Sequence, residues 1–327
     1  MAQLPLAPVQ PALQPPGRAV VASASASSRP ILAPRQRRAD HKGVKYDLVL
    51  SSGFLAFANH CGFLQAVDDV GLPVGGIMGT SAGALIGSLY AAGYAPREIV
   101  EVFANSAPIE RLACSKRIWE GVLSMQPLIE ELHTLLPASF ADLQRDFAAG
   151  VVSASGQHVL LDRGSLPAAV TASAAIPVVF CPVEVPDRED GPFIDGGIKC
   201  RIGLDLWRQQ RYGSDPAAAA PAVVHLIGRS SPFSGNDNTA GLNRQNAVVV
   251  KSPKSGGSFF SYGDYETQFE AARQRALPVL RQLLESDSGG GDQGGRSSSV
   301  AGAANGVVPS LGLTGSGAGS GLATTSS

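Results

Sequence analysis

The sequence predicts an α/β protein in which a mostly parallel sheet carries helices on both faces. Two observations support this fold class. Short apolar runs of the kind that form buried strands alternate along the chain with segments of helical periodicity. Glycine and proline lie at the ends of these segments, where they end helices and mark turns. A hydrophobic content of 44% in 327 residues is that of a globular protein.

The pattern is clearest in the first part of the chain. Phe63, Leu64 and Val67 fall on one face of a predicted helix, which Gly71 and Pro73 end. The predicted elements are, in order, a strand at 45–50, a turn at 51–57, a helix at 58–70, a strand at 74–78, and helices at 84–92 and 96–103.

The second part repeats the alternation with shorter strands. A hairpin turns around Ala-Ser-Gly at 154–156, and the last helix contains Pro278, which predicts a kink or a break there. The predicted elements are hairpin strands at 148–153 and 157–161, a helix at 165–173, a strand that ends at Ile194, strands at 222–227 and 247–250, and a helix at 265–284.

Residues 1–43 differ in composition from the middle of the chain. They hold seven prolines and five arginines, and the first acidic residue is Asp40. An arginine- and serine-bearing segment without acids is typical of an organelle transit peptide. Proline at this density prevents an amphipathic helix, which favours a chloroplast over a mitochondrial address. The alternative is a disordered tail without an address, on a cytoplasmic protein.

Residues 286–327 contain 12 glycines and 10 serines and no aromatic residue. Such a segment cannot bury enough apolar surface to offset the entropy lost on ordering, so we predict a disordered, flexible tail. The folded domain then spans residues 44–285, the size of one large domain.

Charge and cysteine spacing exclude several classes of function. A formal net charge of −1 gives no reason to expect a nucleic-acid partner or a polybasic membrane patch. No apolar run reaches 18 residues, so no transmembrane segment is expected. The four cysteines have no C-x-x-C spacing, which argues against a zinc site and a disulfide scaffold. We therefore expect neither a metal nor another cofactor.

The motif most indicative of chemistry is Gly-Thr-Ser-Ala-Gly at 79–83, between a predicted strand and a predicted helix. In this context G-x-S-x-G predicts a nucleophile elbow, a tight turn that lifts Ser81 above the sheet edge. Gly79 and Gly83 fit such a turn because a Cβ at either position would clash. The following helix N-terminus favours the charge of an oxyanion. A glycine- and serine-rich turn without catalysis is the alternative.

A serine nucleophile needs a base within hydrogen-bond reach. Ser81, Asp195 and His225 follow the chain order of an α/β-hydrolase triad, but His225 lies inside the apolar run at 222–227, where a packed histidine is expected. We therefore favour Asp195, which follows a strand and precedes two glycines. Its reference pKa of about 3.9 is low for a base, so we expect burial to raise it.

From about Tyr46 to Lys199 the chain resembles the patatin-like phospholipase family. The resemblance rests on ordered blocks: Gly-Thr-Ser-Ala-Gly-Ala-Leu at 79–85, Ala-Ser-Ala-Ala-Ile-Pro at 172–177, Cys-Pro-Val at 181–183 and Asp-Gly-Gly at 195–197. It implies a three-layer α/β/α sandwich and a Ser–Asp dyad, with Ser81 as nucleophile and Asp195 as base. It also implies calcium-independent hydrolysis of phospholipid or galactolipid acyl esters through an acyl-enzyme, with peripheral contact to membrane lipid.

The loop after the first strand departs from the family pattern. Members usually carry G-G-G-x-[RK]-G there, whose backbone N–H groups form the oxyanion hole. Here residues 52–57 read Ser-Gly-Phe-Leu-Ala-Phe, so that Gly53 is the one glycine and Ala56 replaces the basic residue. Gly53 and Phe54 are the candidate oxyanion donors, because backbone N–H groups need no particular side chain. Apolar side chains dominate the loop: Phe54, Leu55 and Phe57.

Two functions are compatible with this sequence. The first is a lipid acyl hydrolase with a Ser81–Asp195 dyad. The second is a catalytically silent lipid- or protein-binding member of the same fold, because the loss of one oxyanion donor lowers kcat by ~10²–10³. Trp119 and Trp207 are expected to be packing or lid residues.

Overall fold

The computed structural model describes residues 44–288 except 117–118, 214, 216–217, 230–236, 238, 240–241 and 243–245. The predicted transit peptide at 1–43 lies outside the described residues, as does nearly all of the predicted tail at 286–327. Residues 286–288 belong to the last helix, so the helix continues past the predicted end of the domain.

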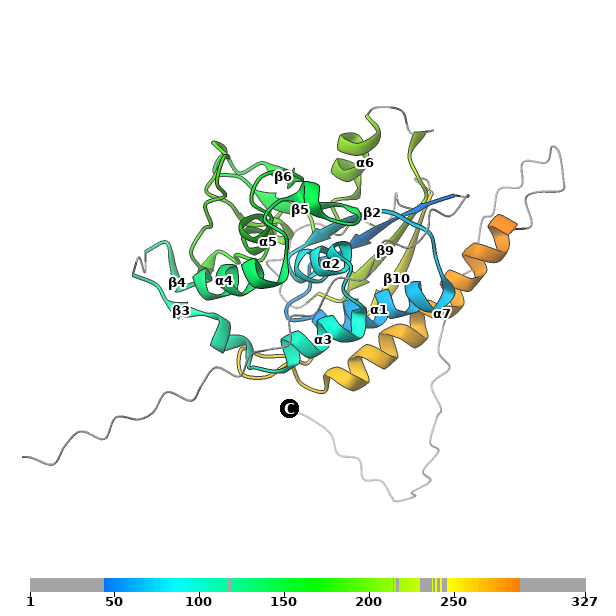
Figure 1. The fold of residues 1–327 in the computed structure, drawn as a ribbon, viewed down its shortest axis with the longest axis horizontal. Coiled ribbons are helices and arrows are strands. Elements are labelled where there is room, and N and C mark those ends of the chain that lie inside the picture. Colours follow the sequence, from blue (N-terminus) through cyan, green and yellow to red (C-terminus); the bar gives the residue numbers. More distant parts are fainter. Residues whose placement is uncertain are drawn as a thin grey trace, which may run out of the picture.

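A central sheet organises the described part of the chain, where it contains seven strands (Figure 1). They are β1 (Tyr46–Leu50), β2 (Val74–Thr80), β5 (Asp146–Val152), β6 (His158–Leu161), β8 (Ile194–Asp195), β9 (Ala222–Ile227) and β10 (Ala247–Ser252). The order is β10-β9-β1-β2-β5-β6, and β8 also pairs with β5. β10, β9, β1, β2 and β5 are parallel, whereas β6 and β8 run antiparallel to β5. The predicted mostly parallel sheet is confirmed.

Helices cover both faces of this sheet. Successive side chains of a strand point to opposite faces, so one strand contributes to the hydrophobic core on each side. Leu48 and Leu50 of β1 enter the larger core, and Val49 enters the smaller one. The larger core contains side chains of α1 (Phe57–Val70), α2 (Ala82–Ala92), α3 (Pro96–Ala104), α4 (Gln126–Leu135), α5 (Leu166–Ser173) and α7 (Tyr265–Ser288). The smaller core contains Leu204 and Trp207 of α6 (Leu204–Tyr212). The three-layer α/β/α architecture is therefore confirmed.

A hydrogen-bonded cluster holds α6 against the sheet. Trp207 Nε1 donates to the buried Asp47 carboxylate at 2.7 Å, and the Tyr212 hydroxyl donates to the same carboxylate at 2.9 Å. Trp207 is only 4% exposed. Trp207 is therefore a packing residue, in agreement with one of its two predicted roles.

The strand register brings the candidate residues to one edge of the sheet. Leu50 pairs with Gly79, so the loops that follow β1 and β2 begin side by side. Asp195 pairs with Val151 near the end of β5, which places it at the same edge. β1 has β2 on one side and β9 on the other. Ligands of open α/β sheets bind at such a point, beyond the carboxyl ends of the strands.

Two features differ from the sequence-based expectation. Pro278 was expected to kink or split the last helix, but α7 is one helix from Tyr265 to Ser288. Leu277 and Leu280 beside it are buried, so packing compensates for the hydrogen bond that proline removes. A second, smaller sheet was not predicted. It consists of β3 (Ala113–Cys114), β4 (Gly121–Ser124) and β7 (Val178–Phe180).

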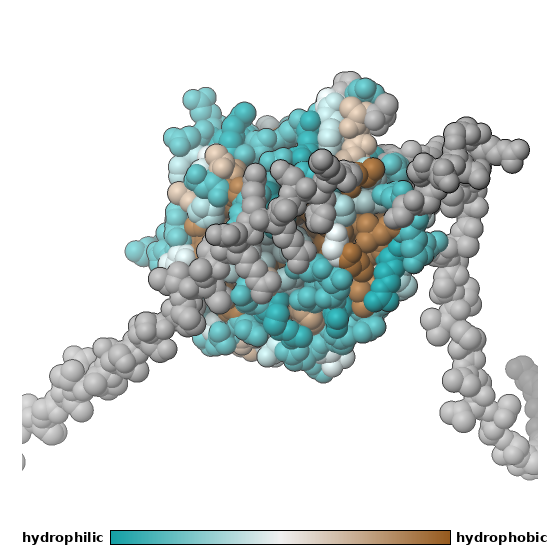
Figure 2. Space-filling view, turned by 45° about the vertical axis from the view of Figure 1, so that its right-hand side comes forward, coloured by the Kyte–Doolittle hydropathy of each residue, from teal (hydrophilic) through white to brown (hydrophobic). Residues whose placement is uncertain are grey.

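The surface is mainly hydrophilic on the face drawn in Figure 2, and hydrophobic residues gather there in separate patches. None of the helices in the described ranges combines the length and the apolar character needed to cross a membrane.

Candidate active site

Ser81 is the single residue between β2 and α2. Its backbone has φ 56° and ψ −121°, a region that non-glycine residues seldom adopt and that is associated with functional sites. The Ser81 N–H donates to Ser173 Oγ at 2.9 Å, and that hydroxyl donates to the Gly150 carbonyl at 2.6 Å. Helix α5 and strand β5 thus hold the strained turn, which has the geometry of the predicted elbow.

The two glycines of the elbow are required by close backbone contacts. A Cβ on Gly79 would lie 2.4 Å from the Gly83 carbonyl oxygen, and a Cβ on Gly83 would lie 2.2 Å from the Leu50 carbonyl oxygen. Both distances are far below van der Waals contact. The predicted steric reason for Gly79 and Gly83 therefore holds, and Gly83 additionally lets α2 approach β1.

Asp195 is buried at the end of β8 and is fixed through its backbone and its side chain. Its N–H donates to the Ala175 carbonyl at 2.9 Å, and its Oδ1 accepts the Gly197 N–H at 2.7 Å. The nearby Ser81 hydroxyl also stabilises the ionised form of this carboxylate. The structure thus brings together the two residues that the sequence predicts as nucleophile and base.

Burial raises the pKa of Asp195 from 3.8 to about 6, although the hydrogen bonds from Ser81 and Gly197 act in the opposite direction. At neutral pH the carboxylate is still largely ionised. Its raised pKa also makes it a better general base near neutral pH than an exposed aspartate. The expected effect of burial on this group is present.

His225 takes part in a buried network instead of facing Ser81. His60 Nε2 lies 3.0 Å from the Ser51 carbonyl, which can only accept, so this nitrogen carries a proton. His60 Nδ1 therefore accepts from His225 Nδ1 at 2.9 Å, and His225 Nε2 accepts from the Ser252 hydroxyl at 3.0 Å. Burial lowers the pKa of both rings, to about 3 for His60. Both are neutral, and their nitrogens are engaged within the network.

The loop at 52–57 lies beside Ser81 and is strained at one residue. Leu55 has φ 50°, which glycine would adopt without strain. Within the described part of the chain, the N–H groups of Gly53 and Phe54 have no hydrogen-bond acceptor. Both residues line the cavity that contains Ser81. Their role as oxyanion donors stays a prediction, which the lack of an internal acceptor permits.

Arg201 is an important residue that the sequence analysis missed. Its side chain is almost completely buried and donates to the Ser52 carbonyl at 2.9 Å, to Ser52 Oγ at 3.2 Å and to the Ile227 carbonyl at 2.5 Å. It also forms an ion pair with Asp237 at 2.9 Å. The loop at 52–57 lacks its own basic residue at Ala56, and Arg201 supplies a cation from another segment. Nothing in the local sequence distinguishes this arginine from a surface residue.

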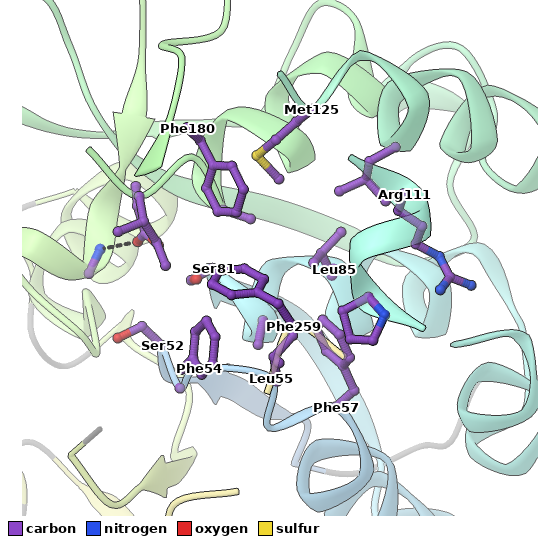
Figure 3. Close-up of a pocket in the computed structure, with 18 of the residues that line it drawn as sticks. Ser52, Phe54, Leu55, Phe57, Ser81, Leu85, Arg111, Met125, Phe180 and Phe259 are labelled. Carbon is purple, nitrogen blue, oxygen red and sulfur yellow. Dashed lines mark hydrogen bonds between the residues drawn. The ribbon is translucent and has the colours of Figure 1, made fainter. Parts of the chain in front are cut away.

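Ser81 and Asp195 line a cavity of about 390 Å³, within the size range of small-molecule sites. In Figure 3, Ser81 lies between the loop that carries Ser52 and Phe54 and the opposite wall with Phe180 and Met125. The wall is mainly apolar: Phe54, Leu55, Phe57, Leu85, Phe103, Leu112, Met125, Leu128, Ile176, Phe180, Phe259 and Tyr262. The three apolar side chains predicted near the site are among them.

Both arginines that line this cavity, Arg111 and Arg201, are paired with a carboxylate. Arg111 is buried, and its Nε lies 2.7 Å from Glu131 Oε2. In the described ranges, no cluster of three or more histidine, cysteine, aspartate or glutamate side chains has an arrangement suited to a metal ion. The cavity therefore fits an apolar chain, with polar groups concentrated at Ser81 and Asp195.

Comparison with known proteins gives partial but consistent matches. An uncharacterized NTE family protein of Mycobacterium tuberculosis is 32% identical over 160 residues, and the same values hold for one of Mycobacterium bovis. The match covers 46% of this chain and 42% of either relative, so the chain spans less than half of their length. Among solved structures, VipD from Legionella pneumophila has 14% identity and a TM-score of 0.42, over 74% of this chain and 67% of VipD. ExoU in its complex with SpcU from Pseudomonas aeruginosa has 16% identity and a TM-score of 0.40, over 74% of this chain and 52% of ExoU.

The predicted chloroplast location is wrong. The curated relatives named above are proteins of mycobacteria, which have no chloroplast. The prediction relied on composition alone, and an acid-free segment rich in arginine, serine and proline is not specific to transit peptides. That segment also lies outside the described residues.

The sequence profile of the patatin-like phospholipase family matches residues 48–205. This range contains β1, the elbow at Ser81, the Ser173 block and Asp195, which are the elements that build the site. Residues 48–205 of this chain therefore belong to the patatin-like phospholipase family.

Proposed function

We propose that this chain is a lipid acyl hydrolase that cleaves acyl esters of phospholipids or galactolipids through a Ser81–Asp195 dyad. One observation carries the proposal. The Ser81 hydroxyl is close enough to the buried Asp195 carboxylate to stabilise its charge, and both line a largely apolar cavity. A nucleophile and a base close together, next to a compartment suited to an acyl chain, are what ester hydrolysis of a lipid requires.

In the first step Ser81 Oγ attacks the ester carbonyl carbon, and its proton moves to the Asp195 carboxylate. The carbonyl oxygen becomes an oxyanion, which Gly53 and Phe54 stabilise with their backbone N–H groups. The bond to the alcohol then breaks, and the departing oxygen takes the proton from Asp195. The acyl group stays on Ser81 as an ester.

In the second step water attacks the acyl-enzyme, and Asp195 accepts a proton from this water. The second oxyanion collapses with release of the carboxylic acid, and Ser81 recovers its proton from Asp195. The raised pKa of Asp195 supports both steps, because the group must accept a proton and then return it.

The apolar wall supports the choice of a lipid over a small polar ester. Each methylene that leaves water contributes about 0.8 kcal/mol. Edge-to-face contact between Phe54 and Phe259, with ring centroids 5.2 Å apart, connects the predicted oxyanion loop to this wall. An acyl chain in the cavity would therefore lie directly beside the reacting carbonyl.

Reaction with a fluorophosphonate probe tests the proposal. We expect the full chain to be labelled and Ser81→Ala to remain unlabelled. Ser88→Ala is the matched control, because it also removes a buried hydroxyl from this region but leaves the cavity unchanged. Asp195→Asn should react at least ~100-fold more slowly. A folded wild-type chain that resists the probe would instead support the catalytically silent binding member, for which the strained Leu55 is the structural argument.

A further inference from the structure

Exposed apolar side chains are concentrated near one wall of the cavity. In the part of the chain that the structure describes, five large hydrophobic side chains are exposed, and one of these, Val44, precedes β1. The other four form what we call the apolar rim: Trp119 (77% exposed), Val122 (58%), Val178 (80%) and Phe260 (77%).

Two members of the apolar rim are close in sequence to residues that line the cavity. Phe180 and Phe259 both line the cavity and contact each other, with ring centroids 6.1 Å apart. Val178 and Phe180 are the first and last residues of β7, and Phe260 directly follows Phe259. These two exposed side chains are thus within two residues of the aromatic pair that forms part of the cavity wall.

The remaining members of the rim belong to the hairpin of β3 and β4. Gly121 of β4 pairs with Val178, so Val122 lies next to this pair, and Trp119 lies between the two strands of the hairpin. The hairpin projects from the body of the molecule (Figure 1). A projecting hairpin with an exposed tryptophan can insert into apolar surroundings outside the protein without disturbing the core.

Val178 is also held in an unfavourable conformation. Its φ is +71°, which is a clear outlier for a β-branched residue. Because the side chain is 80% exposed, packing in the core does not account for this conformation. Strain of this kind, combined with an exposed apolar side chain, is typical of a binding surface.

We propose that the apolar rim docks this protein on the surface of a lipid bilayer. The inference rests on the proposed function, because a bilayer supplies the acyl chain that the cavity would accept. A chain that passes from the bilayer over Val178 and Phe260 to Phe180 and Phe259 remains in apolar surroundings. Tryptophan is favoured at the level of lipid head groups, which suits Trp119.

The charges beside the rim indicate insertion rather than electrostatic attraction. The charged residues next to Trp119 in the sequence are Lys116, Arg117 and Glu120, which leaves a local net charge of only +1. Docking should therefore occur on zwitterionic vesicles and depend weakly on salt, unlike the docking of a polybasic segment.

Tryptophan fluorescence tests the proposal directly, because the chain contains only Trp119 and Trp207. Trp207 is buried and bonded to Asp47, so a change in emission reports on Trp119. Phosphatidylcholine vesicles are titrated into the full chain carrying Ser81→Ala, so that hydrolysis cannot alter them. We expect a blue shift, with quenching by brominated lipid, that Trp119→Phe removes.

Variants of the rim provide the second measurement. Val178→Ser and Phe260→Ser should each lower the vesicle partition coefficient about tenfold, while hydrolysis of a soluble short-chain ester stays unchanged. Val44→Ser is the matched control, because it removes an exposed valine outside the rim.

An unshifted emission spectrum, or rim variants that partition like the wild type, would overturn the proposal. Self-association in the ultracentrifuge that Phe260→Ser abolishes, without vesicle binding, would also overturn it in favour of a protein interface. Vesicle binding without ester hydrolysis would defeat only the proposed function. Hydrolysis of soluble esters without vesicle binding would defeat only the docking surface.

Discussion

Arg201 Nη2 lies 2.9 Å from the backbone carbonyl oxygen of Ser52, the residue that precedes the candidate oxyanion donors. The Ser52 N–H in turn donates to the Arg201 carbonyl at 3.0 Å, so the two residues are joined through both backbone and side chain. A buried guanidinium must keep its partners, because an unpaired buried charge is costly. Arg201 therefore fixes the start of the loop that presents the N–H groups of Gly53 and Phe54.

This relationship predicts a specific kinetic defect for Arg201→Met. If the loop loses its anchor, the oxyanion loses well-placed donors, and kcat should fall about 100-fold with little change in KM. Arg201→Lys keeps the charge but not the fork geometry and should be impaired almost as strongly. Kinetics with a soluble ester, together with thermal unfolding, measure both. Arg229→Met is the control, since Arg229 pairs with the same Asp237 from an exposed position. An activity loss that merely follows the unfolded fraction would refute the positioning role.

Ser173 holds the elbow and should be sensitive to loss of its hydroxyl. Ser173→Ala leaves the Ser81 N–H without its acceptor and the Gly150 carbonyl without its donor. An unsatisfied buried group costs about 1–3 kcal/mol, so we expect the free energy of unfolding to fall by that amount. We also expect kcat/KM to fall at least tenfold, because the strained backbone of Ser81 relaxes. Urea denaturation and ester kinetics measure the two effects. Wild-type kcat/KM in this variant would show that the rest of the turn suffices.

The pKa of Asp195 predicts the acidic limb of the pH–rate profile. Only the ionised carboxylate can accept the Ser81 proton, and burial raises its pKa to about 6. The value of kcat/KM for a soluble ester should therefore rise with pH through about 6 and become constant above it. Circular dichroism at each pH verifies that the protein remains folded. A limb near 3.8, the ordinary value, would mean that the carboxylate is hydrated during turnover.

The buried histidines predict a pH dependence of stability rather than of turnover. Because burial lowers the pKa of His60 and His225 in the folded protein, the unfolded state binds more protons below about pH 6.5. The free energy of unfolding should therefore decrease as the pH falls from about 6.5 toward about 3, the pKa of His60. Chemical denaturation across this range measures the decrease.

His225→Gln separates the structural role from the triad alternative. We expect the free energy of unfolding to fall by about 1–3 kcal/mol, with less than a tenfold change in kcat/KM. A folded variant that loses more than about a thousandfold, equivalent to roughly 4 kcal/mol, would make His225 the base instead of Asp195.

Phe54 predicts selectivity for acyl length. In a series of soluble esters, kcat/KM should rise with chain length because added methylenes enter the apolar cavity. Phe54→Ala should flatten this rise and affect the shortest ester least, since its backbone N–H remains. Equal loss for every length would place the Phe54 ring in the architecture of the loop, where it contacts Phe259.

Local patterns were sufficient to predict the sheet and the two central residues. The elbow at Ser81 and the turn after Asp195 are each encoded in a few consecutive residues, and the parallel strands are continuous apolar runs. The small sheet of β3, β4 and β7 was missed because its strands are only two to four residues long and join distant segments. Helix α6 was missed because its sequence is mainly polar, and it is held by a contact with Asp47.

The supporting side chains could not be predicted, because their partners are remote in sequence. His60 pairs with a residue 165 positions away, a contact that no local pattern indicates. Arg201 reaches Ser52 across 149 positions. Ser173 belongs to a family block, but the block does not reveal that its hydroxyl supports the nucleophile. Such contacts depend on how the strands are ordered, which periodicity does not specify.

Asp195 and Arg201 lie on one short segment, which passes through the tight turn at Gly196–Ile198. A Cβ on Gly196 would lie 2.4 Å from the Gly150 carbonyl, and one on Gly197 would lie 2.7 Å from Ser52 Cβ, so the segment has little freedom to slide. The proton acceptor Asp195 and the anchor Arg201 thus belong to the same constrained segment, residues 195–201. A shift of this segment would displace Asp195 and Arg201 together. A site that keeps the base but loses the anchored oxyanion loop, or the reverse, is therefore disfavoured. A compound that displaces Gly197, which lines the cavity, would therefore move the base and loosen the oxyanion loop together.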